Sequence, residues 1–414
     1  MKILHVVQNY SPSVGGTQWL FQCVSERLVS DFGDEVTVFT TDSYYGPHKK
    51  VAKKIPVNKE TINGVQVKRF SFYNFYYQWI DVITRLCTKL KLSVNEGIAR
   101  YRVGPWSPAL NKELQHAKFD VVCGSSSHYL YMTYPLWRNK KGIPKPFIFM
   151  GALHLKEERK DDFIPKKVLQ AINASEFYIA NTVFEKNRLI EYGVDVDKIK
   201  VVGCGIDIEK FELKTENNFK KELGVGDKIV IGFFGRQEKT KGIPMLLEAF
   251  EQLAQQYDNI VLLIAGGATL YTEEIKTKIA SFNEDIRKRC TVVTGVDESK
   301  KVEIYNTIDI FVSTSDAESF GIVFLEAWAC KKPVVGARTG AVSSVIDDGV
   351  DGLLVSPGVT ENLVTQLQSL IADRNMRIRM GEAGFNKVKE KYTWSIIVSK
   401  YRNIYQEAIN KFYV

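Results

Sequence analysis

Short apolar runs alternate with amphipathic stretches along almost the whole chain of 414 residues. The first unit has an apolar run at residues 2–7, a glycine-bearing loop at 12–16 and an amphipathic stretch at 17–32. Parallel strands need such crossovers and are buried on both faces, so this alternation is typical of parallel sheets covered by helices. The sequence therefore predicts an α/β protein built from doubly wound sheets.

Two series of strand candidates follow this pattern. After residues 2–7, the first series comprises residues 35–40, 65–70, 120–124, 146–150, 177–180 and 199–202. The second begins with KIVIGFFG at 228–235 and continues through NIVLLIAGG, CTVVTG, IDIFVST, PVVGA and GLLVS. A short glycine-bearing link at 203–211 separates them, and the length exceeds the commonest domain size about two- to threefold. We predict two Rossmann-like domains, at residues 1–205 and 206–393, and a final amphipathic helix at 394–414.

The composition excludes several classes of protein. Hydrophobic residues make up 45% and charged residues 25% of the chain, which is the globular average and argues against disorder. The most apolar segment, residues 260–270, is shorter than the ~20 residues that a membrane-spanning helix needs. The six cysteines have no metal-ligand spacing, so we expect buried thiols in a reducing, cytoplasmic compartment, with neither disulfides nor a zinc site.

The positive charge is concentrated in one segment. The chain carries a net charge of +8, and residues 43–112 hold 13 Lys and Arg against 3 Asp and Glu. This basic segment also contains the aromatic run FSFYNFYYQW at 70–79. Aromatic rings beside cations suit an anionic membrane surface, whereas a solvated basic face over a tyrosine-rich cover is the equally weighted alternative. No recognition motif accompanies the charge, so nucleic acid is not an expected partner.

The strongest motif is ESFGIVFLE at residues 318–326, which follows the apolar run IDIFVST. It places Glu318 and Glu326 around an expected helix start, where unpaired N–H groups favour a diphosphate. Eight helical residues would separate the two carboxylates by up to ~12 Å. One could then accept hydrogen bonds from sugar hydroxyls and the other from ribose hydroxyls. The alternative is two surface glutamates on an ordinary crossover helix.

Two cations follow the strand candidate at 228–235. Arg236 comes directly after Gly235, and Lys241 precedes Gly242. Open α/β sheets bind ligands at the carboxyl ends of their strands. The arginine fork and the compact lysine charge both suit the phosphate oxygens of a diphosphate leaving group.

These motifs and several glycines occur in the order found in one enzyme family. They are Gly15-Gly16, Gly235-Arg236, Lys241-Gly242, Gly266-Gly267, Gly295-Val296 and the run from Glu318 to Glu326. They extend over nearly the full length, and the chain resembles the retaining GT-B fold glycosyltransferases of family four. The resemblance implies two Rossmann-like domains that face a cleft, with the final helix packing back on the N-terminal domain.

The resemblance also implies roles for individual residues. Arg236 and Lys241 would neutralise the donor diphosphate, and Glu318 would contact the transferred sugar. Glu326 would hold the ribose and Val296 would lie against the base, and the other donor-binding residues would be Gly15, Gly16, Gly266, Phe320, Gly321 and Ile322. A histidine near the C6 hydroxyl of the sugar would be His154, with His128 as the other candidate.

Asp195 and Asp197 form the Asp-x-Asp pattern with which glycosyltransferases of the other major fold hold a metal ion. Their position between a helix and a strand favours turn formation and helix capping instead. Because Arg236 and Lys241 already supply two cations for the diphosphate, we expect no metal ion and no cofactor.

The expected activity is retaining transfer of a sugar from a nucleoside-diphosphate donor to a glycan or to a lipid-linked envelope or polysaccharide acceptor. The departing β-phosphate would itself help to deprotonate the acceptor on the front side of the sugar. The alternatives are a non-catalytic GT-B subunit and a related nucleotide-sugar enzyme such as an epimerase or a phosphorylase. The basic segment indicates a peripheral position at the inner face of the cytoplasmic membrane.

Overall fold

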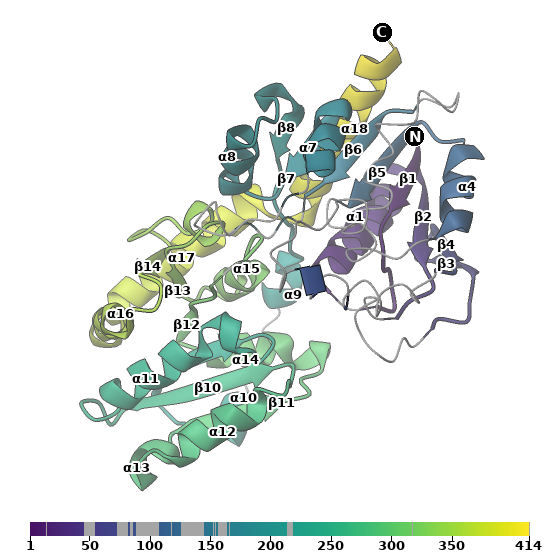
Figure 1. The fold of residues 1–414 in the computed structure, drawn as a ribbon. Coiled ribbons are helices and arrows are strands. Elements are labelled where there is room, and N and C mark those ends of the chain that lie inside the picture. Colours follow the sequence, from purple (N-terminus) through teal and green to yellow (C-terminus); the bar gives the residue numbers. More distant parts are fainter. Residues whose placement is uncertain are drawn as a thin grey trace.

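The computed structural model describes residues 1–13, 15–44, 54–72, 82, 86–87, 107–116, 118–125, 145–151, 153, 155, 164, 166–212, 218–316 and 318–413. They form two sheets, each with helices packed around it, and in Figure 1 the first sheet lies toward the upper right and the second toward the lower left. The strands β1 to β8 belong to the first sheet, and β9 to β14 belong to the second.

The first sheet has eight strands in the order β3-β4-β2-β1-β5-β6-β7-β8. They are β1 (Lys2–Val6), β2 (Glu35–Thr41), β3 (Lys59–Ile62), β4 (Val65–Phe70), β5 (Val121–Ser125), β6 (Phe147–Met150), β7 (Phe177–Ala180) and β8 (Ile199–Val201). Every pair is parallel except β3 with β4. Because β1 pairs with β2 on one side and β5 on the other, the strand order reverses at β1, and such switch points are where open sheets bind ligands.

The strand β3 was not predicted from the sequence. It forms a hairpin with β4 through Asn63 and Gly64, whose φ angles are 47° and 83°. Two consecutive positive φ angles define the type I′ turn, for which Asn-Gly is a preferred sequence. The Asn-Gly pair was therefore the signal that could have revealed this antiparallel edge strand.

The second sheet has six parallel strands in the order β11-β10-β9-β12-β13-β14. They are β9 (Ile229–Phe234), β10 (Ile260–Gly266), β11 (Cys290–Thr294), β12 (Ile310–Ser313), β13 (Val334–Ala337) and β14 (Gly352–Val355). Numbered from β9, this is the order 3-2-1-4-5-6 of a Rossmann sheet. The prediction of two doubly wound, mainly parallel sheets is confirmed.

The α-helices of the first half are α1 (Gly16–Phe32), α4 (Pro108–His116), α7 (Lys166–Ala174) and α8 (Val183–Glu191), and α9 (Ile208–Glu212) and α10 (Asn218–Glu222) follow β8. Those of the second half are α11 (Ile243–Leu253), α12 (Thr272–Ala280), α13 (Glu284–Arg287), α14 (Lys301–Thr307), α15 (Ile322–Ala329), α16 (Thr360–Ala372) and α17 (Arg374–Lys391). The last helix is α18 (Trp394–Tyr413).

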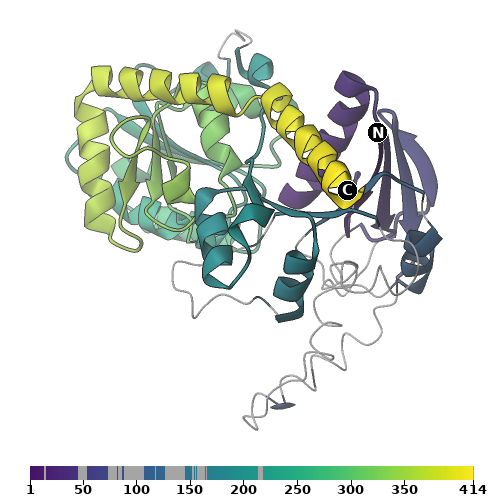
Figure 2. The same cartoon turned by 90° about the horizontal axis from the view of Figure 1, so that it is seen from above.

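The helix α18 crosses from the second half of the chain to the first, where it contacts α1, β5 and β6 (Figure 2). The chain passes between the halves twice, and the two passages pair with each other. The amide of Ile206 donates to the carbonyl of Tyr392 at 2.8 Å, and the amide of Trp394 donates to the carbonyl of Ile206 at 3.3 Å. The two linkers therefore form one hydrogen-bonded connection.

A buried histidine joins α18 to the first sheet. The Nδ1 atom of His5 on β1 lies 2.7 Å from the hydroxyl of Ser25, and its Nε2 atom lies 3.0 Å from the hydroxyl of Tyr405 on α18. Complete burial lowers the pKa of His5 to about 3. The imidazole is therefore a neutral linker between hydroxyl groups, outside the predicted cleft residues.

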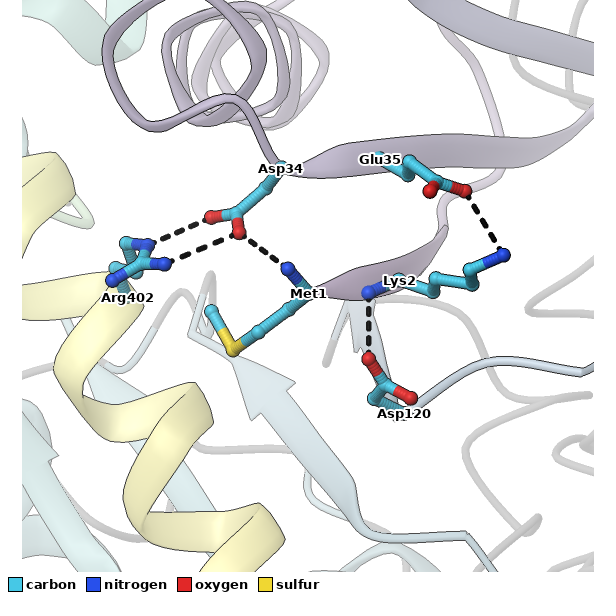
Figure 3. A network of polar contacts seen from close by, with 6 residues as sticks. All are labelled: Met1, Lys2, Asp34, Glu35, Asp120 and Arg402. Carbon is cyan, nitrogen blue, oxygen red and sulfur yellow. Dashed lines mark hydrogen bonds and ion pairs between the residues drawn. The ribbon is translucent and has the colours of Figure 1, made fainter.

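A carboxylate network also holds α18 in place (Figure 3). The buried Asp34 accepts from the amine of Met1 at 2.6 Å and from Nε of Arg402 at 2.8 Å. On the other side of β1, the amide of Lys2 donates to Asp120 at 2.7 Å. These contacts join the beginnings of β1 and β2 to α18 and so hold the last helix against the first sheet.

Three expectations from the sequence concern the cysteines, membrane-spanning helices and metal ligands. All six cysteines are free thiols. In the described ranges no helix is long and apolar enough to cross a membrane, and no group of three or more His, Cys, Asp or Glu residues could hold a metal ion.

Candidate active site

A cavity of about 430 Å³ lies between the two halves of the chain. The first half contributes the start of α1 and the ends of β6 and β7, and the second half contributes the end of β9 and the loop that precedes α15. The lining residues are Gly16, Thr17, Gln18, Leu20, Gly151, Asn181, Cys204, Phe233, Phe234, Gly235, Arg236, Lys241, Ser313, Glu318, Ser319, Phe320, Gly321, Ile322 and Val323. This cleft brings together carboxyl ends of strands from both sheets.

Seven of the predicted site residues line this cleft, namely Gly16, Arg236, Lys241, Glu318, Phe320, Gly321 and Ile322. Gly15, Gly266, Val296 and Glu326 are described but do not line it. His128 and His154, the two candidate histidines, lie outside the described residues.

Lys241 and Glu318 form an ion pair within the wall that the second half contributes to the cleft. The Lys241 ammonium lies 2.6 Å from the Glu318 carboxylate, and their side chains are 20% and 17% exposed. Lys241 ends a short 3-10 helix (Lys239–Lys241), after which Gly242 turns with a φ of 77°. A Cβ atom at Gly242 would lie 2.3 Å from the carbonyl oxygen of Thr314, so only glycine permits this turn. The tight turn thus sets Lys241 opposite Glu318.

Arg236 is held more loosely than Lys241. Its side chain is 69% exposed, and its guanidinium lies 2.9 Å from the carboxylate of Glu238. Exposed pairs of this kind contribute little to stability. The guanidinium can therefore leave Glu238 for a phosphate at little cost.

Gly266 has a packing role that explains the residue type. A Cβ atom there would lie 2.1 Å from the carbonyl oxygen of Gly235, because the ends of β9 and β10 approach closely. Gly266 thus allows the turn into Arg236.

The helix α15 points its first turn at the cleft. Gly321 precedes it with a φ of 96°, and Gly321, Ile322 and Val323 all line the cavity. The first N–H groups of a helix have no intrahelical partner and can bind an anion, so the first turn of α15 lies at the cleft with groups of the kind that the motif predicted. The assumption that the residues from Glu318 to Glu326 are all helical is wrong, however, because α15 begins only at Ile322 and Glu318 lies in the loop before it.

Glu326 is neither a surface glutamate nor a residue of the cleft wall. It is buried in α15, where its Oε1 atom lies 2.7 Å from the Lys301 ammonium and its Oε2 atom accepts from the Tyr305 hydroxyl at 2.7 Å. Both partners belong to α14, which starts at Lys301. A buried carboxylate needs such partners to offset its desolvation.

The glycines at the start of α1 differ in their surroundings. Nothing lies within 4 Å of a Cβ atom at Gly16, whereas one at Gly15 would lie 2.3 Å from the Gln18 amide oxygen. Gly15 is the N-cap of α1, and Gly16, Thr17 and Gln18 line the cleft. The first turn of α1 therefore faces the first turn of α15 across the same cavity.

The Asp-x-Asp pair is a helix cap. Asp195 precedes the 3-10 helix Val196–Lys198, and its Oδ1 atom accepts from the amide of Asp197 at 3.0 Å. This is the turn-forming role that the sequence favoured.

The cleft wall of the first half contains residues that sequence reasoning missed. Glu185 is buried behind Gly151 and Asn181, and it accepts from the amide of Asn181 at 2.7 Å, the amide of Leu153 at 3.3 Å and the hydroxyl of Tyr178 at 2.6 Å. Burial raises its pKa to about 7, although the three donors oppose the shift. The sequence signal for this part of the wall was a polar residue, Asn181, directly after the buried strand β7.

Cys204 also lines the cleft. Burial raises its pKa well above the usual value of a thiol. The thiolate is the nucleophilic form of cysteine, so Cys204 is a wall residue and not an activated nucleophile.

Two family models match the chain. Residues 14–210 match the model described as Glycosyltransferase Family 4, and residues 214–387 match the model described as Glycosyl transferases group 1. The chain belongs to glycosyltransferase family four. The first match ends within α9 and the second begins between α9 and α10, so each model covers one half of the chain.

Curated relatives of this family-four chain are similar over part of their length. A D-inositol 3-phosphate glycosyltransferase of Xylanimonas cellulosilytica is 29% identical over 250 residues, and one of Corynebacterium jeikeium is 31% identical over 248 residues. Each match covers 58% of this chain and 59% of the relative. The chain thus spans less than two thirds of the curated relatives it matches.

Solved structures match the fold over nearly the whole chain. HepE of Anabaena in complex with UDP and glucose has a TM-score of 0.69 and 18% identity, covering 98% of this chain and 100% of HepE. Sucrose-phosphate synthase of Thermosynechococcus elongatus has a TM-score of 0.71 and 16% identity, covering 99% of this chain and 100% of the synthase. These matches confirm the predicted GT-B architecture.

Proposed function

We propose that this chain is a retaining glycosyltransferase that moves a sugar from a nucleoside-diphosphate donor to a hydroxyl group of a glycan or lipid-linked acceptor. The observation that carries the proposal is the Lys241–Glu318 pair beside the first turn of α15. The cation and the unpaired N–H groups suit the diphosphate of a sugar nucleotide. The carboxylate suits the hydroxyl groups of its sugar ring.

In the proposed reaction, Lys241, Arg236 and the N–H groups of α15 bind the diphosphate. The bond between the anomeric carbon and the phosphate oxygen breaks, and the negative charge that develops on this oxygen is stabilised by the cations. The acceptor hydroxyl attacks the same face of the sugar, and its proton passes to the departing phosphate. The products are a nucleoside diphosphate and a glycoside with retained configuration.

Two features favour transfer over the alternatives. A non-catalytic subunit would not need the diphosphate-binding cations, and this chain has both Arg236 and Lys241 on the cleft wall. Its curated relatives are named as glycosyltransferases, and HepE was solved with UDP and glucose. We propose the same class of donor here.

A panel of nucleoside diphosphates and sugar nucleotides tests the donor. One base and one sugar are expected to raise the melting temperature, because a ligand at 100 times its Kd stabilises a protein by about 2.7 kcal/mol. The same sugar nucleotide should release its nucleoside diphosphate slowly without an acceptor. An epimerase would instead yield an isomeric sugar nucleotide, and a phosphorylase would require inorganic phosphate. A protein stabilised by no member of the panel would contradict the proposal.

We propose further that the acceptor is presented at an anionic membrane surface through the basic segment at 43–112. Much of this segment, including Lys49, Lys50 and most of the aromatic run, lies outside the described residues. The described part shows that some cations are engaged: Lys68 lies 2.5 Å from Glu113, and the buried Arg69 pairs with Glu60. The segment's remaining excess of cations supports the proposal.

Co-sedimentation with vesicles tests the membrane proposal. We expect binding to vesicles with anionic lipid at low salt, release at high salt because ions screen the attraction, and no binding to neutral vesicles. Absence of binding to the anionic vesicles at low salt would rule out the membrane role and leave the transfer reaction untouched.

A further inference from the structure

We propose that Asn181 binds a carbohydrate hydroxyl in the cleft, with its amide oxygen Oδ1 as the hydrogen-bond acceptor. This inference rests on the proposed function. Asn181 directly follows β7, lines the cleft and is only 4% exposed. Its Oδ1 atom is buried and has no hydrogen-bond partner within the described part of the chain.

The orientation of the Asn181 amide is determined by its neighbour. Its Nδ2 atom donates to the carbonyl oxygen of Gly151 at 3.2 Å. A carbonyl can only accept, so the nitrogen of the amide must face Gly151 and the oxygen must point elsewhere. The unsatisfied atom is therefore an acceptor and not a misassigned donor.

The backbone around Asn181 is also fixed. Its amide donates to Glu185 at 2.7 Å, and the same carboxylate receives the hydroxyl of Tyr178 at 2.6 Å. A Cβ atom at Gly151 would lie 2.4 Å from the carbonyl oxygen of Ile179, which shows how closely the ends of β6 and β7 approach. Asn181 consequently has a preset position before any ligand enters.

An unsatisfied buried acceptor costs about 1–3 kcal/mol, and in native proteins it needs an explanation. The ligand that satisfies it must supply a donor. Phosphate and carboxylate groups offer only acceptors at neutral pH, whereas every sugar carries several hydroxyl donors. Lys241 and Arg236 suit the diphosphate on the opposite wall. The chemistry at Asn181 therefore excludes phosphate and carboxylate groups and fits a sugar hydroxyl, from either the donor or the acceptor.

The experiment compares wild type with Asn181→Ala, with the exposed Asn187→Ala on α8 as the matched control. We expect Asn181→Ala to bind the bare nucleoside diphosphate as wild type does, while its use of one sugar substrate falls about 10-fold or more, which is the loss of about 1.4 kcal/mol. Weaker sugar-nucleotide binding and slower donor hydrolysis would locate the hydroxyl on the donor. A raised KM for the acceptor, with unchanged donor hydrolysis, would locate it on the acceptor. Asn187→Ala should change neither.

A second measurement does not depend on the variant's folding. Wild-type protein is assayed with donors and acceptors that each lack one hydroxyl group, and one such analogue should lose activity by the same factor that Asn181→Ala loses. The inference is wrong if every analogue that lacks one hydroxyl group is used normally. That is the result expected if a buried water molecule donates the hydrogen bond to Oδ1. It is also wrong if Asn181→Ala retains wild-type kinetics. If wild type binds no nucleoside diphosphate, the proposed function itself fails, and the two failures are thereby distinguished.

Discussion

Replacement of Lys241 by alanine is expected to lower turnover about 10²- to 10³-fold. Loss of a preorganised group that stabilises developing charge costs about this much, roughly 3–4 kcal/mol. The loss has two parts here. The developing phosphate charge loses its cation, and Glu318, which lies 2.6 Å from Lys241, remains as an uncompensated anion beside it. The measurement is single-turnover transfer or donor hydrolysis at saturating donor.

The matched control is Lys239→Ala, an exposed lysine in the same short helix. It should retain wild-type turnover, because it does not line the cleft. The double variant Lys241→Ala with Glu318→Ala should lose less than the product of the two single losses, since contacting residues act non-additively. Near-normal turnover in Lys241→Ala, or an equal loss in Lys239→Ala, would contradict the assigned role.

The grouping of Arg236, Lys241 and Glu318 on one wall of the cleft was predictable from a single rule of sheet topology. The carboxyl ends of parallel strands lie at one edge of a sheet. Arg236 and Lys241 follow β9, and Glu318 follows β12, the strand paired with β9. The order of the predicted strands is therefore enough to bring these residues together.

The wall of the first half was not predictable in the same way. Asn181 also follows a buried strand, yet no spacing indicates that its carboxamide has an unsatisfied oxygen, because that depends on Gly151, thirty residues earlier in the chain. The Lys301–Glu326 pair was not predictable from the sequence for the same reason. It joins two helices separated by β12, and its geometry follows from how α14 and α15 pack.

Glu326→Ala is the second change for which we expect a large effect, and it should act on stability as well as on binding. Glu326 and Lys301 have side chains 9% and 18% exposed. Removal of one partner of a buried ion pair costs roughly 3–5 kcal/mol, because the other charge stays desolvated. If Glu326 also holds the ribose, the nucleotide affinity should fall together with the melting temperature.

The two effects can be separated with the paired substitution Glu326→Gln and Lys301→Met. It removes both charges at similar volume and keeps an acceptor for the hydroxyl of Tyr305. Since replacing a buried ion pair by residues of similar volume is often neutral, the free energy of unfolding should return close to that of wild type. Nucleotide affinity should stay weak, because a neutral amide accepts ribose hydroxyls less strongly than a carboxylate. If affinity recovers together with stability, Glu326 supports α15 from behind and does not hold the ribose.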